Sequence, residues 1–343
     1  MGEGPIDVGL GRDPLLRQGE AVYIAPRWLP GAHAQTIWPA LFSCPAAAVS
    51  PLPWVRERWD TPDGDFVDVD RIFVEKRGVA PLVVLFHGLE GSSRSHYAQA
   101  VAHACMRAGW NVAVPHFRGC SGEPNRASRA YHSGDWQEID WILRRFCATH
   151  GGALHSIGVS LGGNALLRWA EESGHAATSV VHSLASVSAP IDLAAGAEAI
   201  SRGFNRWVYT RMFLRTLKPK AISMVHRYPG LADASAIAAA QDLRAFDNAF
   251  TAPVHGFRDA DDYWRRASAK PHMARIRVPT LLINARNDPF LPANALPKAG
   301  EITPGVWMEQ PEQGGHAGFA RGVPPGVLDW LPRRILHFFA HGL

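Results

Sequence analysis

Apolar runs of strand length alternate with helical segments along most of this chain, and that alternation limits its fold more than any other feature. Helices are expected around His96–Arg107, Asp135–Thr149, Leu161–Gly174 and Val327–Ala340. Buried strands are expected at Leu82–Phe86, Trp110–Pro115, Ala153–Val159, Val180–Val187, Thr280–Ala285 and Val306–Glu309. Strands and helices of this size in alternation predict an α/β fold, with a mostly parallel central sheet and helices on both faces.

Two departures from the alternation divide the chain. The runs Trp54–Trp59 and Phe66–Val74 flank the turn tetrapeptide Thr61–Gly64, which predicts an antiparallel hairpin leading into the sheet. From 190 to 277 the sequence is helical, rich in Ala, Arg and aromatic residues, and has no convincing strand. We interpret the division as a helical lid (190–277) inserted into a core (51–189 and 278–343), with an N-terminal arm (1–50) packed on that core.

The composition agrees with one core that carries an insertion. The 343 residues are 47% hydrophobic, which is enough to bury a large interior. The net charge of +4 is spread along the chain, so we expect no nucleic-acid partner. The basic residues suit ordinary solvated positions, an anionic substrate or a lipid headgroup surface. The sequence does not indicate an oligomeric state.

Several other classes of protein find no support in the sequence. The cysteines have unrelated spacings, so neither a disulfide framework nor a zinc site is expected. His-Glu-x-x-His, a Walker-type loop and Gly-x-Gly-x-x-Gly are absent, so we expect no metal and no cofactor. Met1–Glu20 lacks the basic start and apolar centre of a signal peptide, and no apolar run reaches the roughly 18 residues that span a bilayer. We therefore expect a soluble, cytoplasmic protein.

The strongest functional motif is Gly158-Val159-Ser160-Leu161-Gly162, which lies between an apolar strand and an amphipathic helix. This context matches a sharp turn that holds a serine hydroxyl clear of the sheet in strained backbone geometry. Strand and helix approach so closely there that the residues two before and two after the serine must be small, as Gly158 and Gly162 are. The N-terminus of the helix points at any negative charge that forms beside the hydroxyl. Ser160 is therefore the predicted nucleophile.

A serine hydroxyl needs a base to react at neutral pH, usually a histidine that a carboxylate orients. With this motif the acid follows a late strand and the histidine lies near the C-terminus. His316 is in the glycine-flanked loop Gln-Gly-Gly-His-Ala-Gly-Phe, whereas His337 and His341 are in the expected last helix, so His316 is the predicted base. Asp288 closely follows the strand Thr280–Ala285 and is the predicted orienting acid, although Asp before Pro is also a common turn signal.

Acyl transfer also needs hydrogen-bond donors for the oxyanion, each worth roughly 3 to 4 kcal/mol of barrier when lost. The expected donors are the backbone N–H groups of Leu161, after the nucleophile, and Leu89, in the loop after the first buried strand. Gly88 lets that loop turn inward, and His87 is expected to fix it by hydrogen bonds, with a direct chemical role as the alternative. We interpret Gly119-Cys120-Ser121-Gly122 as a loop, because no helix follows it directly.

Seven stretches that span most of the chain match a known family. They are WLPGAHAQTIWP (Trp28–Pro39), FHGLEGSSRSHY (Phe86–Tyr97), PHFRGCSGEPNRASRAYHSGD (Pro115–Asp135), GVSLGGNALLRW (Gly158–Trp169), TAPVHGFRDADDYW (Thr251–Trp264), INARNDPFLP (Ile283–Pro292) and EQGGHAGF (Glu312–Phe319). In these stretches the chain resembles the YheT-type α/β-hydrolases, bacterial relatives of eukaryotic ABHD-type phospholipases and acylglycerol lipases. The resemblance implies an α/β-hydrolase fold, the triad Ser160, Asp288 and His316, and esterase or lipase activity without a cofactor.

The expected reaction is hydrolysis of a small-molecule or lipid ester, with short to medium acyl chains, through an acyl-enzyme. Two alternatives stay open: an acyltransferase that uses the same acyl-enzyme, and a hydrolase-like binding protein without turnover, which the intact triad disfavours. The segment Arg202–Lys220 of the lid mixes basic and large apolar residues. It suits an acyl-chain pocket, a transient membrane-surface contact, or simple packing on the core.

Overall fold

An eight-stranded sheet forms the centre of the computed structural model, which describes residues 22–44, 51–74 and 79–342. The strand order is β1-β2-β4-β3-β5-β6-β7-β8. The hairpin strands β1 and β2 pair antiparallel, β2 pairs antiparallel with β4, and all other neighbours are parallel. The strands are β1 (Val55–Asp60), β2 (Phe66–Ile72), β3 (Leu82–Phe86), β4 (Asn111–Pro115), β5 (Leu154–Val159), β6 (Ser183–Val187), β7 (Thr280–Ile283) and β8 (Val306–Glu309). The predicted α/β architecture is confirmed.

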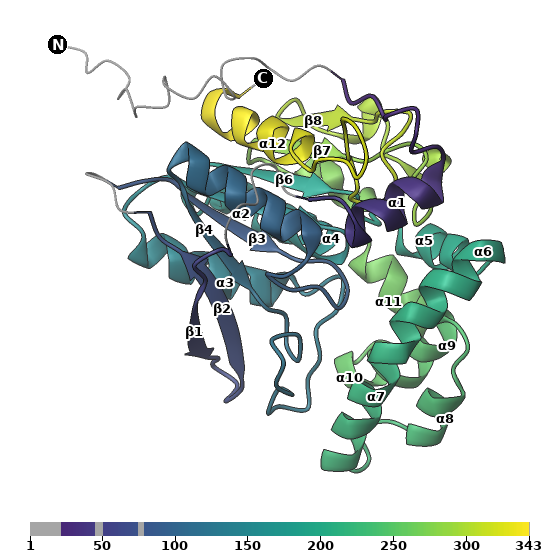
Figure 1. The fold of residues 1–343 in the computed structure, drawn as a ribbon. Helices are drawn as coiled ribbons and strands as arrows, with labels where there is room; N and C mark the ends of the chain where they lie inside the picture. The colour runs from purple at the N-terminus through teal and green to yellow at the C-terminus, as the bar shows by residue number, and fades with distance from the viewer. Residues whose placement is uncertain (1–21, 45–50, 75–78, 343) are drawn as a thin grey trace.

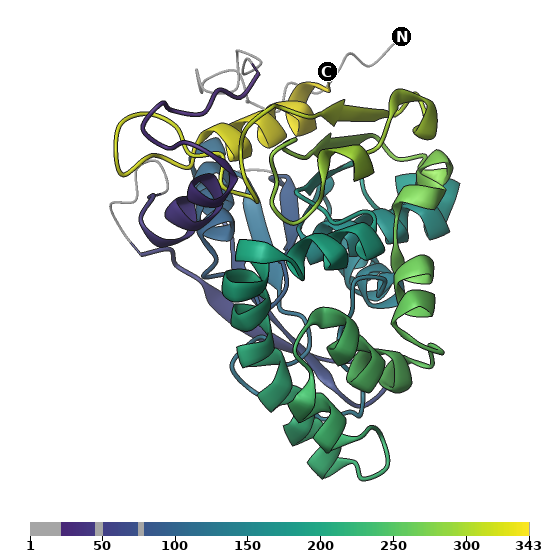
Figure 2. The ribbon, with the colours of Figure 1, turned by 90° about the vertical axis from the view of Figure 1, so that its right-hand side faces the viewer.

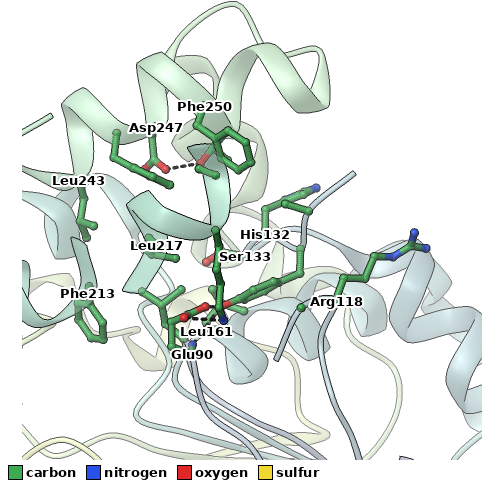
Figure 3. A pocket seen from close by; sticks show the side chains of 18 of the residues that line it. Glu90, Arg118, His132, Ser133, Leu161, Phe213, Leu217, Leu243, Asp247 and Phe250 are labelled. Carbon is green, nitrogen blue, oxygen red and sulfur yellow. Dashed lines mark hydrogen bonds and ion pairs between the residues drawn. The ribbon is translucent and has the colours of Figure 1, made fainter. Parts of the chain in front are cut away.

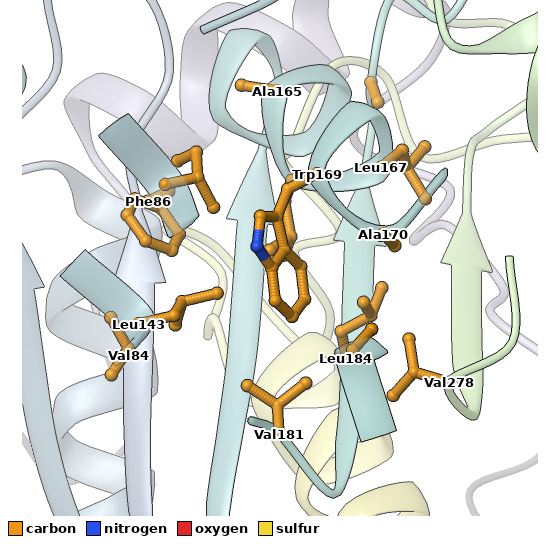
Figure 4. Close-up of a cluster of buried hydrophobic side chains, with 14 of the residues drawn as sticks. Val84, Phe86, Leu143, Ala165, Leu167, Trp169, Ala170, Val181, Leu184 and Val278 are labelled. Carbon is orange, nitrogen blue, oxygen red and sulfur yellow. The ribbon is translucent and has the colours of Figure 1, made fainter. Parts of the chain in front are cut away.

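Helices cover both faces of this sheet (Figures 1 and 2). One face carries α3 (Trp136–Thr149) and α4 (Leu161–Ser173), and the other carries α2 (His96–Ala108) and α12 (Trp330–His341). Because the parallel strands are buried on both sides, they read as unbroken apolar runs. Figure 4 shows Trp169 of α4, which is fully buried among apolar side chains of the sheet and its flanks. Burying one such side chain contributes roughly 1.5–3 kcal/mol.

Two predicted boundaries differ from the structure by three residues, and the others by at most two. The strand expected from Val180 begins only at Ser183, because Gly174–Ser179 forms a 3₁₀ turn and Val180 closes that turn by donating to the Ala177 carbonyl. The helix expected from Val327 begins at Trp330. Val327 is instead held in isolated β-bridges, one of them parallel and one antiparallel, so its backbone is extended.

The segment between β6 and β7 contains helices and no strand over residues 190–277, all of which are described. Figure 1 shows these helices as a group that extends away from the sheet. They have an apolar cluster of their own, which includes Leu214, Met224, Ile237 and Phe250. The elements are α5 (Leu193–Ile200), α6 (Gly203–Asn205), η4 (Arg206–Thr210), α7 (Arg211–Arg227), α8 (Ala234–Ala239), α9 (Leu243–Phe246), η5 (Asp247–Thr251), α10 (Ala252–His255), α11 (Ala260–Ala267) and η6 (Lys270–Arg275). We keep the interpretation of this segment as a lid.

Part of the N-terminal arm can be described, whereas residues 1–21 and 45–50 lie outside the described residues. Its helix α1 (Ala32–Leu41) follows a short extended stretch that contains Tyr23. The Tyr23 hydroxyl donates to the Ala320 carbonyl at 2.6 Å, and its ring packs edge-on against Phe319 and Trp330. The arm therefore lies against the C-terminal loops. None of the helices in the described ranges is long and apolar enough to cross a bilayer.

Candidate active site

Ser160 stands at a strained corner between β5 and α4. Its backbone has φ 54° and ψ −122°, a conformation that residues with side chains rarely adopt. The flanking glycines show how closely the chain segments approach. A Cβ atom on Gly158 would lie 2.4 Å from the Gly162 carbonyl oxygen, and one on Gly162 would lie 2.4 Å from the Phe86 carbonyl oxygen. The requirement for small residues at both positions follows from these contacts.

The predicted acid and base are in direct contact. His316 Nδ1 lies 2.9 Å from Asp288 Oδ2 and 3.2 Å from Oδ1. This contact keeps the imidazole proton on Nδ1, so Nε2 is the free acceptor that a general base needs. Asp288 also accepts from the Phe290 backbone N–H at 2.8 Å, which fixes the carboxylate.

Ser160, Asp288 and His316 all lie at the carboxyl edge of the parallel part of the sheet, after β5, β7 and β8 respectively. Phe290 links them, because it lines the same cavity as Ser160 and its ring centroid lies 4.0 Å from that of His316. Among the described residues no hydrogen bond joins Ser160 to His316. Catalytic hydrogen bonds often tighten only once substrate binds. The triad as a working unit therefore stays a prediction.

The loop that carries His316 is held from several sides by residues that sequence reasoning did not identify. The His316 backbone N–H donates to Thr36 Oγ1 at 2.9 Å. The Ala317 N–H donates to Ser188 Oγ at 3.0 Å, and His96 Nε2 donates to the Ala317 carbonyl at 3.0 Å. Burial lowers the pKa of His96 to about 4, so it is neutral at physiological pH. In the sequence, the stretch WLPGAHAQTIWP, one of those that carry the family resemblance, is the signal that points to the arm.

The predicted oxyanion donors are backbone amides without a hydrogen-bond partner among the described residues. Neither the Leu89 nor the Leu161 backbone N–H has a hydrogen-bond partner in the described structure, whereas the neighbouring amides of the first loop do. Gly88 N–H donates to the Tyr97 hydroxyl at 2.8 Å, and Glu90 N–H donates to the Tyr131 hydroxyl at 3.0 Å. Two free donors beside a serine suit a developing negative charge. Their role there stays a prediction.

His87 makes hydrogen bonds of the kind that its expected role in fixing the loop requires, and that role stays a prediction. It is fully buried, and its Nε2 accepts from the Phe117 backbone N–H at 3.0 Å. Nδ1 therefore carries the proton and donates to the Gly88 carbonyl at 2.8 Å. Burial lowers the pKa of His87 to about 3, so the ring is neutral and both of its nitrogens are engaged. These contacts leave His87 no free nitrogen for proton transfer.

A cavity of about 550 Å³ connects Ser160 with the lid. Its lid side is mainly apolar, as Leu217, Leu243 and Phe250 show in Figure 3, and its core side includes Leu161 and Glu90. Other apolar lining residues are Leu193, Ile200, Phe213, Met224 and Phe246. The predicted loop Gly119–Gly122 contributes Gly119, Cys120 and Gly122 to the wall of this cavity, and the next helix begins only at Trp136.

The charged groups on the wall of this cavity have partners. Lys220, from α7 of the lid, lies 2.7 Å from the Glu90 carboxylate. Arg118 pairs with Asp63, Asp65 and Glu138. Burial raises the pKa of Asp247 to about 6, and its carboxylate accepts from Thr251 and Trp264. The described residues contain no group of three or more His, Cys, Asp or Glu side chains suited to hold a metal.

Comparisons with known proteins bear on the fold and the family of this chain. A family model described as the alpha/beta hydrolase fold matches residues 81–322. The chain is 39% identical over 321 residues to YheT of Escherichia coli strain K12, whose name assigns it only provisionally as an esterase; the alignment covers 92% of each chain. It is 26% identical to mouse phospholipase ABHD3, over 84% of this chain and 72% of the relative. Among solved structures, Pyrococcus horikoshii acylaminoacyl peptidase matches 86% of this chain and 42% of its own, with a TM-score of 0.53 and 16% identity, which supports the fold alone.

Proposed function

The chain belongs to the alpha/beta hydrolase fold family and is a carboxylic ester hydrolase, and on that premise we propose that it cleaves acyl esters through Ser160, His316 and Asp288. The observation that carries the proposal is the strained serine corner, which lies beside two unpaired backbone amides, at the sheet edge where the His316–Asp288 pair also lies. These are the parts that acyl transfer requires.

The mechanism follows from the roles of these groups. Ser160 Oγ attacks the ester carbonyl while His316 Nε2 takes its proton, and Asp288 stabilises the imidazolium through Nδ1. The Leu89 and Leu161 amides bind the oxyanion as the carbonyl oxygen gains charge. His316 then returns the proton to the leaving alcohol. A water molecule, deprotonated by the same imidazole, attacks the acyl-enzyme, and His316 returns that proton to Ser160 Oγ as the carboxylic acid is released.

The cavity supports an ester with a short to medium acyl chain. Its lid side offers apolar surface close to Ser160, and its wall charges already have partners in Lys220–Glu90 and around Arg118. The desolvation cost of entering this cavity is therefore lowest for an uncharged hydrocarbon chain. The relatedness to a protein named as a phospholipase supports a lipid ester as well as a small-molecule ester.

Hydrolysis of p-nitrophenyl esters of rising acyl length tests this function. The wild type should release nitrophenol with a maximum of kcat/KM at short to medium chains, and Ser160→Ala should lose activity. Asp288→Asn should lower kcat about 10⁴-fold with its fold intact, since the wrong imidazole tautomer is then favoured. Absence of turnover over the whole series would contradict the proposal and leave a binding protein. If an added alcohol suppressed the release of free carboxylic acid, the result would identify an acyltransferase.

We also propose that the lid touches membrane surfaces transiently. Phe204, Trp207 and Met212 are 50%, 65% and 52% exposed, and the Arg211 guanidinium lies over the Trp207 ring. Between 202 and 220 the chain has no acidic residue. Its basic residues are Arg202, Arg206, Arg211, Arg215, Lys218 and Lys220, of which Lys220 lines the cavity and pairs with Glu90. Exposed aromatic and basic side chains along one segment suit an anionic lipid interface.

Co-sedimentation with phosphatidylcholine vesicles, with and without phosphatidylserine, tests the lid surface. Binding should need phosphatidylserine and fall about tenfold in Trp207→Ser/Arg211→Glu. The matched control is Arg107→Glu, on an exposed position of α2, which should bind like the wild type. Equal binding by both variants would contradict the lid contact. The cytoplasm remains the compartment we propose, on the sequence grounds given above.

A further inference from the structure

Gln35 of α1 lies buried between the loops that carry the predicted acid and base. It is 1% exposed, and its amide uses all of its hydrogen-bonding capacity. Nε2 donates to the Leu29 carbonyl and to Gln313 Oε1, both at 2.9 Å. Oε1 accepts from Asn287 Nδ2 and from the Gly314 backbone N–H, both at 2.9 Å.

The two groups that donate to Gln35 Oε1 belong to different catalytic loops. Asn287 directly precedes Asp288, and Gly314 lies two residues before His316. Asn287 closes the connection, because its Oδ1 accepts from the Gly315 backbone N–H at 3.0 Å. A single oxygen atom of the arm therefore joins the acid loop to the base loop.

The backbone of the base loop lies directly against α1. A Cβ atom on Gly315 would lie 2.6 Å from the Gln35 carbonyl carbon, and one on Gly318 would lie 2.0 Å from the Gln35 carbonyl oxygen. The next residue of the helix, Thr36, accepts the His316 backbone N–H itself. Side chains of the arm therefore hold the junction between the acid loop and the base loop. These arm residues precede the 81–322 region that the family model matches.

We propose that Gln35, together with Thr36, is a positioning residue that keeps His316 and Asp288 in the arrangement needed for proton transfer. The inference rests on the proposed function, because it assigns the arm a role in that triad. Neither side chain touches the reacting atoms. A displacement of about 1 Å in a catalytic group can cost about 10²-fold in rate, so loosening this junction lowers kcat while the substrate cavity, and hence KM, is little changed.

Gln35→Met tests the proposal, because it keeps the side-chain length and removes all four hydrogen bonds. We expect kcat for a p-nitrophenyl ester to fall about 10- to 100-fold with KM within about twofold. The pH profile of kcat/KM should change, since the contact between His316 and Asp288 is altered. A double-mutant cycle with Asn287→Ala should show that the two losses are far from additive, because both break the same junction.

Trp38→Phe is the matched control on the same helix. It removes the indole hydrogen bond to the Pro325 carbonyl, at 2.8 Å, and leaves both catalytic loops untouched. It should lower the melting temperature with kcat unchanged. A wild-type kcat in Gln35→Met would overturn the inference. So would a loss of kcat in Trp38→Phe as large as that in Gln35→Met, when the two variants are equally stable.

Two further measurements distinguish a failure of the proposed function from a failure of the role assigned to the arm. Labelling of the wild type at Ser160 by a fluorophosphonate is measured first, and its failure would end the proposed function itself rather than the role of the arm. If Gln35→Met does not fold, Thr36→Val replaces it, since it removes the acceptor for the His316 N–H and, besides it, the bond that the hydroxyl donates to the Ala32 carbonyl of the same helix. A wild-type kcat in folded Thr36→Val would then overturn the inference, and an about tenfold loss at unchanged KM would support it.

Discussion

The glycines around Ser160 mark how little space the serine corner has. Gly162 is the sharpest case, because an added Cβ would meet the backbone oxygens of Phe86 and His87 at 2.4 and 2.5 Å. Backbone atoms cannot move aside as a flexible side chain can. We expect Gly162→Ala to lose roughly 1–3 kcal/mol of unfolding free energy or more, and most of its esterase activity. Urea denaturation and ester hydrolysis measure both effects.

Gly300→Ala is the control for that substitution. Gly300 has no atom within 4 Å of a Cβ position and no positive φ. Its replacement should leave stability within about 0.5 kcal/mol and activity unchanged. If Gly162→Ala behaved like Gly300→Ala, the crowded corner described here would be wrong.

Individual site residues differ in how far sequence could identify them. Ser160, Asp288 and His316 follow strand ends that a local pattern reveals, and the structure brings the last two into contact. Gln35 could not be found in this way, because its partners in the catalytic loops are more than 250 positions away and a buried glutamine has no periodicity that identifies it. Long-range polar contacts depend on the final packing, which local pattern does not encode.

At the scale of elements, the lid sets the shape of the cavity over Ser160. Leu217 of α7 lines this cavity, whereas Ile222 of the same helix does not and packs instead in the lid's own apolar cluster. Leu217→Trp should therefore fill part of the cavity, raising KM about tenfold or more for medium-chain esters and leaving the shortest esters little affected. Ile222→Trp should keep the wild-type chain-length profile. An equal shift in both variants would contradict the assignment of this cavity to the acyl chain.

The elements themselves were largely predictable, and their ends less so. Apolar runs flanked by turn residues located β3 and β8 to the residue. The predicted start of β6 is three residues too early, because the buried Val180 and Val181 look like strand residues although they close a 3₁₀ turn. The packing of the ten helical elements in the lid could not be predicted from sequence patterns. An apolar pattern along one helix does not say which of the other helices that face will contact.

The whole molecule should become less stable as the pH falls. Burial lowers the pKa of several histidines from 6.5 in the unfolded chain. Their contribution to the unfolding free energy is therefore complete above about pH 6.5. It declines as the pH falls toward 4, because the unfolded state takes up protons before the folded state does. Burial also raises the pKa of four described carboxyl groups, which acts in the opposite direction: Glu171 to about 8, Glu138 to about 7, Asp247 to about 6, and Asp135. Eight described histidines have lowered pKa values and outnumber these carboxyls: about 3 for His87, His132 and His155, about 4 for His96, and lowered also for His103, His150, His255 and His272.

The urea midpoint at pH 7.5 and at pH 5.5 measures this balance. We expect a lower midpoint at pH 5.5, since each net proton taken up on unfolding lowers the unfolding free energy by about 1.4 kcal/mol per pH unit. His155→Gln, in the core between Trp110 and Phe339, should show a flatter dependence. A midpoint that rises on acidification would mean that the carboxyl groups dominate.

The most direct measurement of the central claim is the site of covalent modification by a fluorophosphonate, read by peptide mass spectrometry. The account predicts one phosphonylated residue, Ser160, no modification in Ser160→Ala, and a rate of labelling that falls strongly in a folded His316→Ala variant. Labelling at another residue, or undiminished labelling in Ser160→Ala, would contradict it.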